Sequence, residues 1–260
     1  MNCLTVDAGN SQLAMVLYQN GEKTSTLRIR THPHPSVEEM VDSWNQVLSS
    51  RELTSLDVEL SISSVVPQLQ EALREAASQF SPRSFHWVSW ESPHKFGAPE
   101  SAQREIGADL IAGLVGAREV KTGPLVVIDC GTATTLTLVD SDNFVMGVAI
   151  LPGLVTQLLS LTRSAPHLPQ DVSLRPPQDP FGTDTEQALQ SGILYGHSAS
   201  IEGLIGRYQD YFPQEALVAV GCGGLYHRIS SLCPSVEFEQ AELVNLGCRI
   251  LAERQLQEGL

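Results

Sequence analysis

The strongest constraint on the fold is a pattern that occurs twice, near the start and in the middle of the 260-residue chain. Each copy is a short apolar run that ends in Asp-x-Gly and continues into small or polar residues, as in Leu4–Ser11 and Val126–Ala133. The two aspartates, Asp7 and Asp129, lie close to half the chain length apart. A chain with this repeat is expected to fold as two similar halves.

The residues that follow each Asp-x-Gly turn also correspond. A second strand-like run comes next, then a turn signal, and then a third strand-like run. Each half is therefore predicted to begin with three strands, and we expect domains of residues 1–121 and 122–260. The second and third predicted strands are Leu13–Tyr18 and Thr24–Arg30 in the first half, and Thr134–Val139 and Phe144–Ile150 in the second.

Helical and strand patterns alternate along the rest of both halves, which indicates an α/β architecture. Ser36 is expected to cap one helix, and the pair Thr183 and Glu186 is expected to form a capping box that opens a long helix. The proline-rich stretch Pro166–Pro180 is expected to be a surface loop. Helices are predicted over Ser36–Leu48, Pro67–Phe80, Leu110–Val120, Thr185–Tyr211 and Leu243–Leu256, and strands over Leu56–Val65, Phe85–Val88 and Leu217–Val220.

Charge and cysteine content exclude several classes of partner. The chain carries 16 basic and 30 acidic residues, a net charge of −14, which disfavours binding to nucleic acid and to anionic membranes. Five dispersed cysteines without a CxxC pair are typical of reduced, buried thiols in a cytosolic protein. The first apolar run, Cys3–Val6, ends at Asp7, so we expect no signal peptide, no membrane segment and a cytoplasmic location.

The Asp-x-Gly turns suggest a phosphate site. An aspartate at the carboxyl end of a buried strand lies where α/β sheets bind ligands, and it can hold Mg²⁺ directly or through water. The glycine lets the backbone approach a phosphate, and Asn10, Ser11 and Thr132 add neutral donors. A single turn of this kind is often only a strand ending. The matched pair favours a site that grips a nucleotide triphosphate with its metal.

Three further motifs allow two interpretations each. Asp109, in Gly107–Asp109, is either the N-cap of the helix that follows or a general base toward a substrate hydroxyl. Gly182–Thr185 is either a helix cap or a binding site for an anion at a helix N-terminus. Gly221–Gly224 marks either tight packing or close approach to a nucleotide base.

Familiar catalytic and nucleotide-binding signatures are missing. The sequence has no GxxxxGK[ST], no complete GxGxxG and no GxSxG. A P-loop of the usual kind, a dinucleotide-binding fold and an α/β-hydrolase are therefore unsupported.

Taken in order, the motifs resemble those of the type III pantothenate kinases, along essentially the whole chain. The resemblance implies the α/β fold of the actin/hexokinase/Hsp70 ATPases, with two ribonuclease-H-like domains, and a cytoplasmic homodimer. It also implies ATP-dependent phosphorylation of pantothenate, the first step toward coenzyme A, with Mg²⁺ and a monovalent cation, K⁺ or NH₄⁺. The residues that carry it are Asp7–Ser11, Gly107–Asp109, Asp129–Ala133, Pro152–Gly153, Gly182–Thr185 and Cys222–Gly224.

The same resemblance implies roles for individual residues. Asp109 would accept the proton of the pantothenate hydroxyl. Asp7 would organise Mg²⁺–ATP, and Asp129 would be the ligand of the monovalent cation. The other implied ATP-binding residues are Ala8, Gly9, Asn10, Ser11, Gly131, Thr132 and Gly223, and the implied pantothenate-binding residues are Gly107, Ala108, Leu110 and Thr185 together with Asp109.

The sequence departs from the family pattern mainly in the pantothenate pocket. Leu110 stands where the family usually has arginine, Glu100 where it commonly has tyrosine, and Gly147-Val148 where it has Gly-Gly. Loss of a positive donor and an aromatic wall should weaken an anionic substrate by on the order of a few kcal/mol unless they are replaced, and Arg104 is a candidate replacement.

These departures leave three alternatives. The first, which we place ahead of the others, is an active pantothenate kinase with a remodelled pocket, and the intact Asp7, Asp109 and Asp129 favour catalysis over binding alone. Leu110 and Glu100 favour either a kinase for another small hydroxyl compound or a non-catalytic, regulatory homologue that binds nucleotide.

Overall fold

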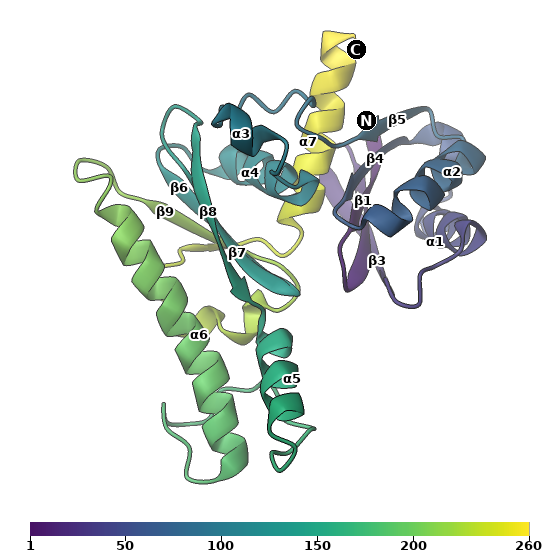
Figure 1. Ribbon diagram of the computed structural model, residues 1–260. Coiled ribbons are helices and arrows are strands. Elements are labelled where there is room, and N and C mark those ends of the chain that lie inside the picture. Colours follow the sequence, from purple (N-terminus) through teal and green to yellow (C-terminus); the bar gives the residue numbers. More distant parts are fainter. Residues whose placement is uncertain (260) are drawn as a thin grey trace. The chain divides into compact units, whose positions relative to one another are not determined.

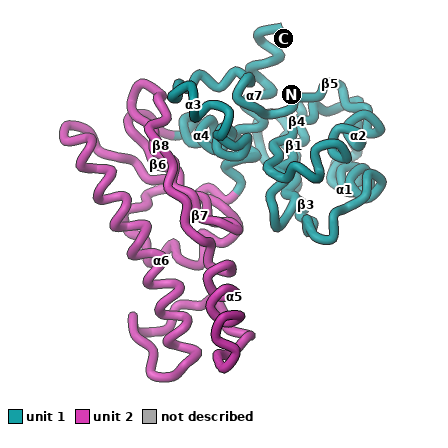
Figure 2. Tube along the Cα trace, in the orientation of Figure 1, with its two compact units in different colours: residues 1–120, 242–260 teal, residues 121–241 magenta. Residues whose placement is uncertain are grey.

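The computed structural model describes residues 1–259, which form two compact units (Figure 2). Unit 1 comprises Met1–Val120 and the segment that begins at Glu242, and unit 2 comprises Lys121–Ala241. The expected second domain, residues 122–260, is therefore wrong at its end, because helix α7 (Leu243–Glu258) packs on the sheet of unit 1. The apolar pattern of α7 predicts a helix but does not show which sheet the helix covers.

Unit 1 is built on one five-stranded sheet with the order β3-β2-β1-β4-β5 (Figure 1). The three opening strands are present as predicted and pair antiparallel, and β1, β4 and β5 pair parallel. The strands are β1 (Asn2–Ala8), β2 (Gln12–Gln19), β3 (Glu22–Arg30), β4 (Glu59–Ser64) and β5 (Ser84–Trp87).

The two faces of this sheet bury different residues. Leu4, Val6 and their neighbours form an apolar core with α1 and α2, in which Trp44 is fully buried. Thr5 and Ser61 point to the opposite face, where they hydrogen-bond with α7. Ser36 caps α1 with Glu39 in a capping box, which confirms the predicted cap. The other helices of unit 1 are α1 (Val37–Ser49), α2 (Gln70–Phe80), α3 (Glu100–Gln103) and α4 (Ala108–Val120).

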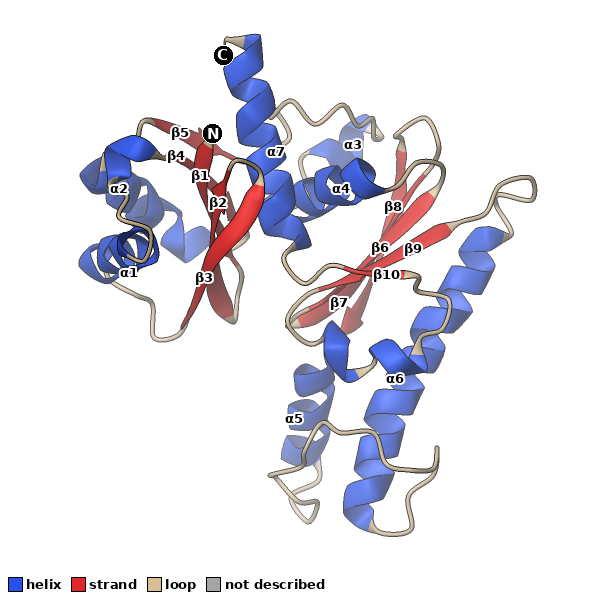
Figure 3. Ribbon diagram, turned by 180° about the vertical axis from the view of Figure 1, so that it is seen from behind, coloured by secondary structure: helices blue, strands red, loops and turns tan. Residues whose placement is uncertain are grey.

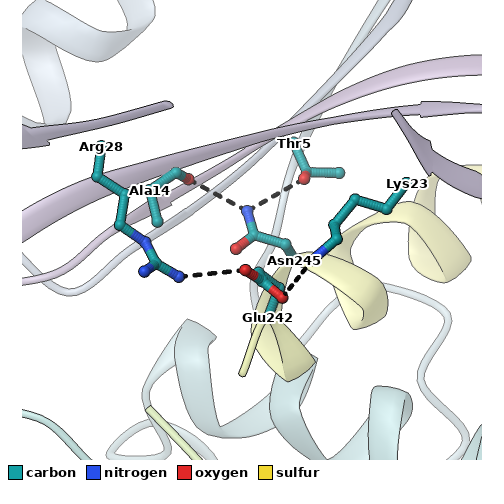
Figure 4. A network of polar contacts seen from close by, with 6 residues as sticks. All are labelled: Thr5, Ala14, Lys23, Arg28, Glu242 and Asn245. Atoms are coloured by element: carbon teal, nitrogen blue, oxygen red, sulfur yellow. Dashed lines mark hydrogen bonds and ion pairs between the residues drawn. The ribbon is translucent and has the colours of Figure 1, made fainter. Parts of the chain in front are cut away.

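A polar network fixes the start of α7 on the sheet (Figure 4). The Glu242 carboxylate accepts from Lys23 Nζ at 2.9 Å and from Arg28 Nη2 at 3.3 Å. One turn into the helix, Asn245 Nδ2 donates to Thr5 Oγ1 and to a backbone carbonyl of β2, each at 3.1 Å. Asn245 and Thr5 are buried, so each satisfies the other's polar group within the sheet–helix layer.

Unit 2 repeats the strand arrangement of unit 1. Its sheet has the order β8-β7-β6-β9-β10, again with the first three strands antiparallel and the last three parallel (Figure 3). This confirms the three-strand opening predicted for each half. The strands are β6 (Leu125–Cys130), β7 (Ala133–Val139), β8 (Val145–Pro152), β9 (Val218–Cys222) and β10 (Phe238–Glu239).

Two helices, α5 (Leu154–Ser164) and α6 (Thr185–Gln209), pack on one face of this sheet and complete its core. Helix α5 was not predicted from the sequence. The predicted capping pair for α6 is wrong by one residue: Asp184 is the N-cap, and its Oδ1 accepts from the Gln187 amide at 2.8 Å. A carboxylate that is placed directly before the helix reaches this amide, whereas Thr183 Oγ1 bonds the Gln187 side chain.

Two sequence expectations about the chain as a whole can be checked within residues 1–259. All five cysteines are free and buried, as expected. None of the helices described in this range is long and apolar enough to cross a membrane.

Candidate functional site

The first Asp-x-Gly turn follows β1, and one buried threonine, Thr31, hydrogen-bonds to its backbone. Thr31, which is 0% exposed, donates from Oγ1 to the carbonyl of Gly9 at 2.6 Å and from its amide to Ser11 at 3.1 Å. The Gly9 amide closes the turn on the Gln12 carbonyl at 3.0 Å. Asn10 and Ser11 remain exposed, so this turn can present polar groups to a ligand.

Unit 1 brings the Gly107–Asp109 motif to the same end of the sheet. The Val65 amide donates to the Ala8 carbonyl at 3.2 Å, directly after the Asp7 position. A Cβ on Gly107 would lie 3.3 Å from Val65 Cγ1 and 2.5 Å from Asp109 Oδ1. Glycine at this position therefore lets the Asp109 side chain and Val65 approach the same backbone. The contacts Ala8–Val65–Gly107 connect both motifs at the carboxyl ends of β1 and β4.

Asp109 lies inside the first turn of α4, which begins at Ala108, so it does not occupy the N-cap position, although its carboxylate accepts from amides at the start of the helix as the cap interpretation expects. Its Oδ1 accepts from the Leu110 amide at 2.7 Å. Burial raises the pKa of the Asp109 carboxyl above its ordinary value, and hydrogen bonds from the Leu110 and Asp109 amides oppose that rise. A partly buried carboxylate with a raised pKa is a stronger proton acceptor than an exposed one, once it is ionised.

The mid-chain turn of unit 2 is enclosed by backbone from the start of α5. The Gly131 amide donates to the Ala133 carbonyl at 2.9 Å, and the Thr132 carbonyl accepts from the Gly153 amide at 3.0 Å and from Thr156 Oγ1 at 2.6 Å. A Cβ on Gly153 would lie 2.2 Å from the Gly131 carbonyl oxygen. The backbone at Pro152–Gly153 therefore packs directly against Gly131 and Thr132, in the loop that is expected to contact ATP.

The loop after β9 reaches the same turn from the other side. Gly223 has a φ of +89°, and a Cβ there would lie 2.3 Å from Asp129 Oδ1 and 2.6 Å from the Cys130 amide nitrogen. Gly221 has a different role, because its Cβ would lie 2.4 Å from the Tyr226 ring. Tight packing therefore explains Gly221, and Gly223 is needed because its backbone lies against Asp129 and Cys130, whereas close approach to a nucleotide base stays a prediction.

Unit 2 therefore gathers Asp129, Gly131, Thr132 and Gly223, whereas Thr185 is an exposed residue at the start of α6. A groove of about 650 Å³ is lined by α5, by Ala188–Ile193 of α6 and by Pro152, and Thr185 is not among its lining residues. The sequence did not single out Thr31 or Thr156, which hold the two turns. No local pattern marks these threonines, because each contributes through a partner that is distant in sequence.

The donor set at the turns suits small hard cations. Within residues 1–259, no group of three or more His, Cys, Asp or Glu side chains could hold a metal ion. Mg²⁺ bound with a nucleotide usually takes only one or two carboxylates, because phosphates and water complete its shell. One aspartate at each turn, Asp7 and Asp129, fits this mode, and oxygen ligands also suit an alkali cation.

Comparison with known proteins places this arrangement in context. A family model described as type III pantothenate kinase matches residues 3–207. A type III pantothenate kinase of Thermomicrobium roseum is 32% identical over 258 residues, covering 96% of both chains. Another, from Rubrobacter xylanophilus, is 30% identical over 254 residues, covering 95% of this chain and 96% of the relative.

Solved structures show the fold. A Campylobacter jejuni protein described as belonging to the Baf family of transcriptional activators matches with a TM-score of 0.60 at 18% identity, over 98% of this chain and 99% of its own. Component A of the (R)-2-hydroxyglutaryl-CoA dehydratase of Acidaminococcus fermentans matches with a TM-score of 0.56 at 11% identity, over 99% of both chains. Together with the two mixed sheets, these likenesses confirm the expected α/β fold of two ribonuclease-H-like domains, that of the actin/hexokinase/Hsp70 ATPases.

Proposed function

The chain belongs to the type III pantothenate kinase family, and we propose from that premise that it transfers the γ-phosphoryl group of ATP to the hydroxyl of pantothenate. The product is 4'-phosphopantothenate, the first intermediate on the way to coenzyme A. The observation that carries the proposal is the placement of Asp109: its carboxylate lies against Gly107, which adjoins Val65, and Val65 is hydrogen-bonded to Ala8 of the first Asp-x-Gly turn. Burial raises the pKa of this carboxyl.

In this reaction Asp109 acts as the general base. Its carboxylate takes the hydroxyl proton while the hydroxyl oxygen forms a bond to the γ-phosphorus. The bond from that phosphorus to the β–γ bridging oxygen breaks, and its electron pair leaves with ADP. The raised pKa of Asp109 strengthens the base, and it requires a pH at which the carboxyl is ionised.

The two turns bind ATP. Asp7–Ser11 and Asp129–Thr132, with Gly223 beside the latter, supply backbone and side-chain donors to the phosphates. Asp7 would hold Mg²⁺ with ATP, and Asp129 would hold a monovalent cation, K⁺ or NH₄⁺. These cations would supply positive charge at the phosphates, which a chain of net charge −14 has little capacity to provide.

The residues that the family implies for binding pantothenate are Gly107, Ala108, Asp109, Leu110 and Thr185, and the usual arginine is missing from this set. Leu110 is partly buried and offers no charge to a substrate carboxylate, and the candidate replacement Arg104 is exposed at the end of α3. This difference favours two alternatives: a kinase for another small hydroxyl compound, or a regulatory homologue that binds nucleotide without turnover.

The family also implies a homodimer in the cytoplasm, and we include both in the proposal. Light scattering after size-exclusion chromatography tests the dimer: a mass near twice 28.2 kDa supports it, and a mass near 28.2 kDa contradicts it.

Pantothenate-dependent ADP release tests the activity. Purified protein with Mg²⁺, K⁺ and ATP should release ADP when pantothenate is added, and Asp109→Asn should reduce the rate about 10²- to 10⁴-fold. Glu105→Gln is the matched control, because it removes an exposed carboxylate from the same segment and should leave the rate unchanged.

The other outcomes distinguish the alternatives. ATP binding without ADP release from pantothenate or any other alcohol would support the regulatory homologue. ADP release that depends on another small alcohol, and that Asp109→Asn abolishes, would support a kinase of different substrate class.

A further inference from the structure

A polar chain crosses the interior of unit 2 and connects α5, α6 and β7. His197 of α6 is 3% exposed, and its Nδ1 lies 2.7 Å from Gln157 Nε2 of α5. On the other side of the ring, His197 Nε2 lies 3.0 Å from Oγ1 of Thr134, which is 0% exposed. Gln157 Nε2 also donates to the Pro152 carbonyl at 2.7 Å.

These contacts fix the proton on the His197 ring. The Pro152 carbonyl can only accept, so the amide nitrogen of Gln157, and not its oxygen, must face it. The same nitrogen donates to Nδ1, which must therefore be unprotonated, so Nε2 carries the hydrogen and donates to Thr134. Burial lowers the pKa of His197, which favours the neutral ring that this arrangement requires.

The two ends of this hydrogen-bonded network, Thr134 and Pro152, both lie next to the Asp129–Thr132 turn. Thr134 pairs with Cys130 in the β6–β7 ladder, and their side chains are hydrogen-bonded. Pro152 directly precedes Gly153, whose amide donates to the Thr132 carbonyl. The ring of His197 therefore connects β7, which follows the turn, with the Pro152–Gly153 segment, which packs against the turn.

We propose that His197 is a positioning residue for ATP binding, which fixes the Asp129–Thr132 turn through Thr134 on one side and through Gln157 and Pro152 on the other. This inference rests on the proposed function, in which that turn contacts the ATP phosphates. A buried, fully paired imidazole with one tautomer is a rigid link, and small displacements of groups that bind phosphate have large effects on binding and rate.

Titration calorimetry with Mg²⁺–ATP on the full chain tests the inference. In His197→Gln the new side chain cannot keep the hydrogen bonds to both Gln157 and Thr134. We therefore expect the Kd for ATP to rise about tenfold, and the KM for ATP to rise by a larger factor than kcat falls. The matched control is His167→Gln, because His167 is exposed in the loop after α5 and should leave the Kd unchanged. A folded His197→Gln variant with the wild-type Kd would overturn the inference and leave the proposed kinase activity standing.

A second pair of variants covers a failure of His197→Gln to fold. Thr134→Ser keeps the hydroxyl that accepts from His197 and should keep the wild-type Kd, whereas Thr134→Val removes it and should weaken ATP binding. Equal Kd values for the two would contradict the positioning role. If wild-type protein binds no ATP, the proposed function and this inference both fail.

A spectroscopic readout separates positioning from simple packing. In ¹⁵N NMR, His197 of the wild type should show the neutral Nε2–H tautomer at neutral pH. Gln157→Glu replaces the donor with an acceptor, so Nδ1 should take up a proton and the His197 pKa should rise. A wild-type spectrum with the proton on Nδ1, or a pKa that Gln157→Glu leaves unchanged, would overturn the assignment.

Discussion

The two Asp-x-Gly turns occupy equivalent places in two sheets of the same strand order, yet they are supported differently. The glycines of the two turns are themselves alike, because a Cβ on Gly9 would lie 3.4 Å and a Cβ on Gly131 3.6 Å from the nearest atom, in each case a backbone oxygen at ordinary contact distance. In unit 2, Cβ atoms on Gly153 and Gly223 would lie 2.2 Å and 2.3 Å from the atoms of the turn. The repeat thus preserves the position of the aspartate but not the way in which its turn is held.

The difference follows from the segment after the third strand. In unit 1, β3 ends at Arg30, and Thr31 and a loop lead to Ser36 and α1. In unit 2, β8 leads through Gly153 directly into α5, whose first turn bonds the Thr132 carbonyl. A threonine hydroxyl therefore bonds each turn, but only the second turn has in addition a bond from the Gly153 amide and close backbone contact at that glycine.

The largest expected effects come from filling the glycine contacts. Gly153→Ala and Gly223→Ala should each cost about 3 kcal/mol of unfolding free energy, because the new Cβ meets backbone or the Asp129 carboxylate and, at Gly223, the φ is positive. Gly9→Ala should cost less than about 1 kcal/mol. Urea unfolding measures all three, and similar losses at Gly9 and Gly153 would refute the comparison.

Smaller effects are expected from the threonines. Thr31→Val should cost about 1–2 kcal/mol, because a buried hydroxyl that holds the Gly9 carbonyl is lost. Thr156→Val should cost about 0.5 kcal/mol, since the Thr132 carbonyl keeps its bond from the Gly153 amide. A larger loss at Thr156 than at Thr31, measured by the same unfolding method, would reverse the account of the two turns.

The smallest effect is a pH dependence of opposite sign in the two units. His197 in unit 2 has a lowered pKa, so its contribution is present above about pH 6.5 and declines as pH falls, because the unfolded chain binds the proton first. Asp109 in unit 1 has a raised pKa, so its contribution is present at acid pH and is lost as pH rises through that value.

Urea midpoints across this pH range measure both contributions. His197→Gln should remove part of the stability loss between pH 7 and about pH 5.5, and Asp109→Asn should stabilise the fold at neutral pH. Unchanged pH profiles in both variants would show that neither group titrates as the structure indicates.

The repeated fold could be predicted from the sequence, because local patterns of apolar and turn residues encode it. Apolar runs separated by turn signals predicted the strand openings of both halves, and Ser36 predicted the start of α1. The final helix was also predicted, but its packing on unit 1 depends on Glu242 and Asn245 meeting residues of β1, β2 and β3. Contacts between such distant segments leave no local signature.

The candidate site was predicted only in part, for the same reason. The turn residues could be named from motifs, and the structure places Asp109 within α4 and not at its cap. Thr31, Thr156 and His197 could not be found, because each acts on a turn that lies far from it in sequence. Helix α5 was missed although Pro152–Gly153 was recognised, since no side chain caps its start.

Mass spectrometry of the reaction products tests the central claim most directly. Incubation of the protein with Mg²⁺–ATP, K⁺ and pantothenate should yield a compound one phosphoryl group heavier than pantothenate, in equal amount to ADP, and Asp109→Asn should form both about 10²- to 10⁴-fold more slowly. ADP without phosphorylated pantothenate, or the same product from Asp109→Asn at the wild-type rate, would contradict the account.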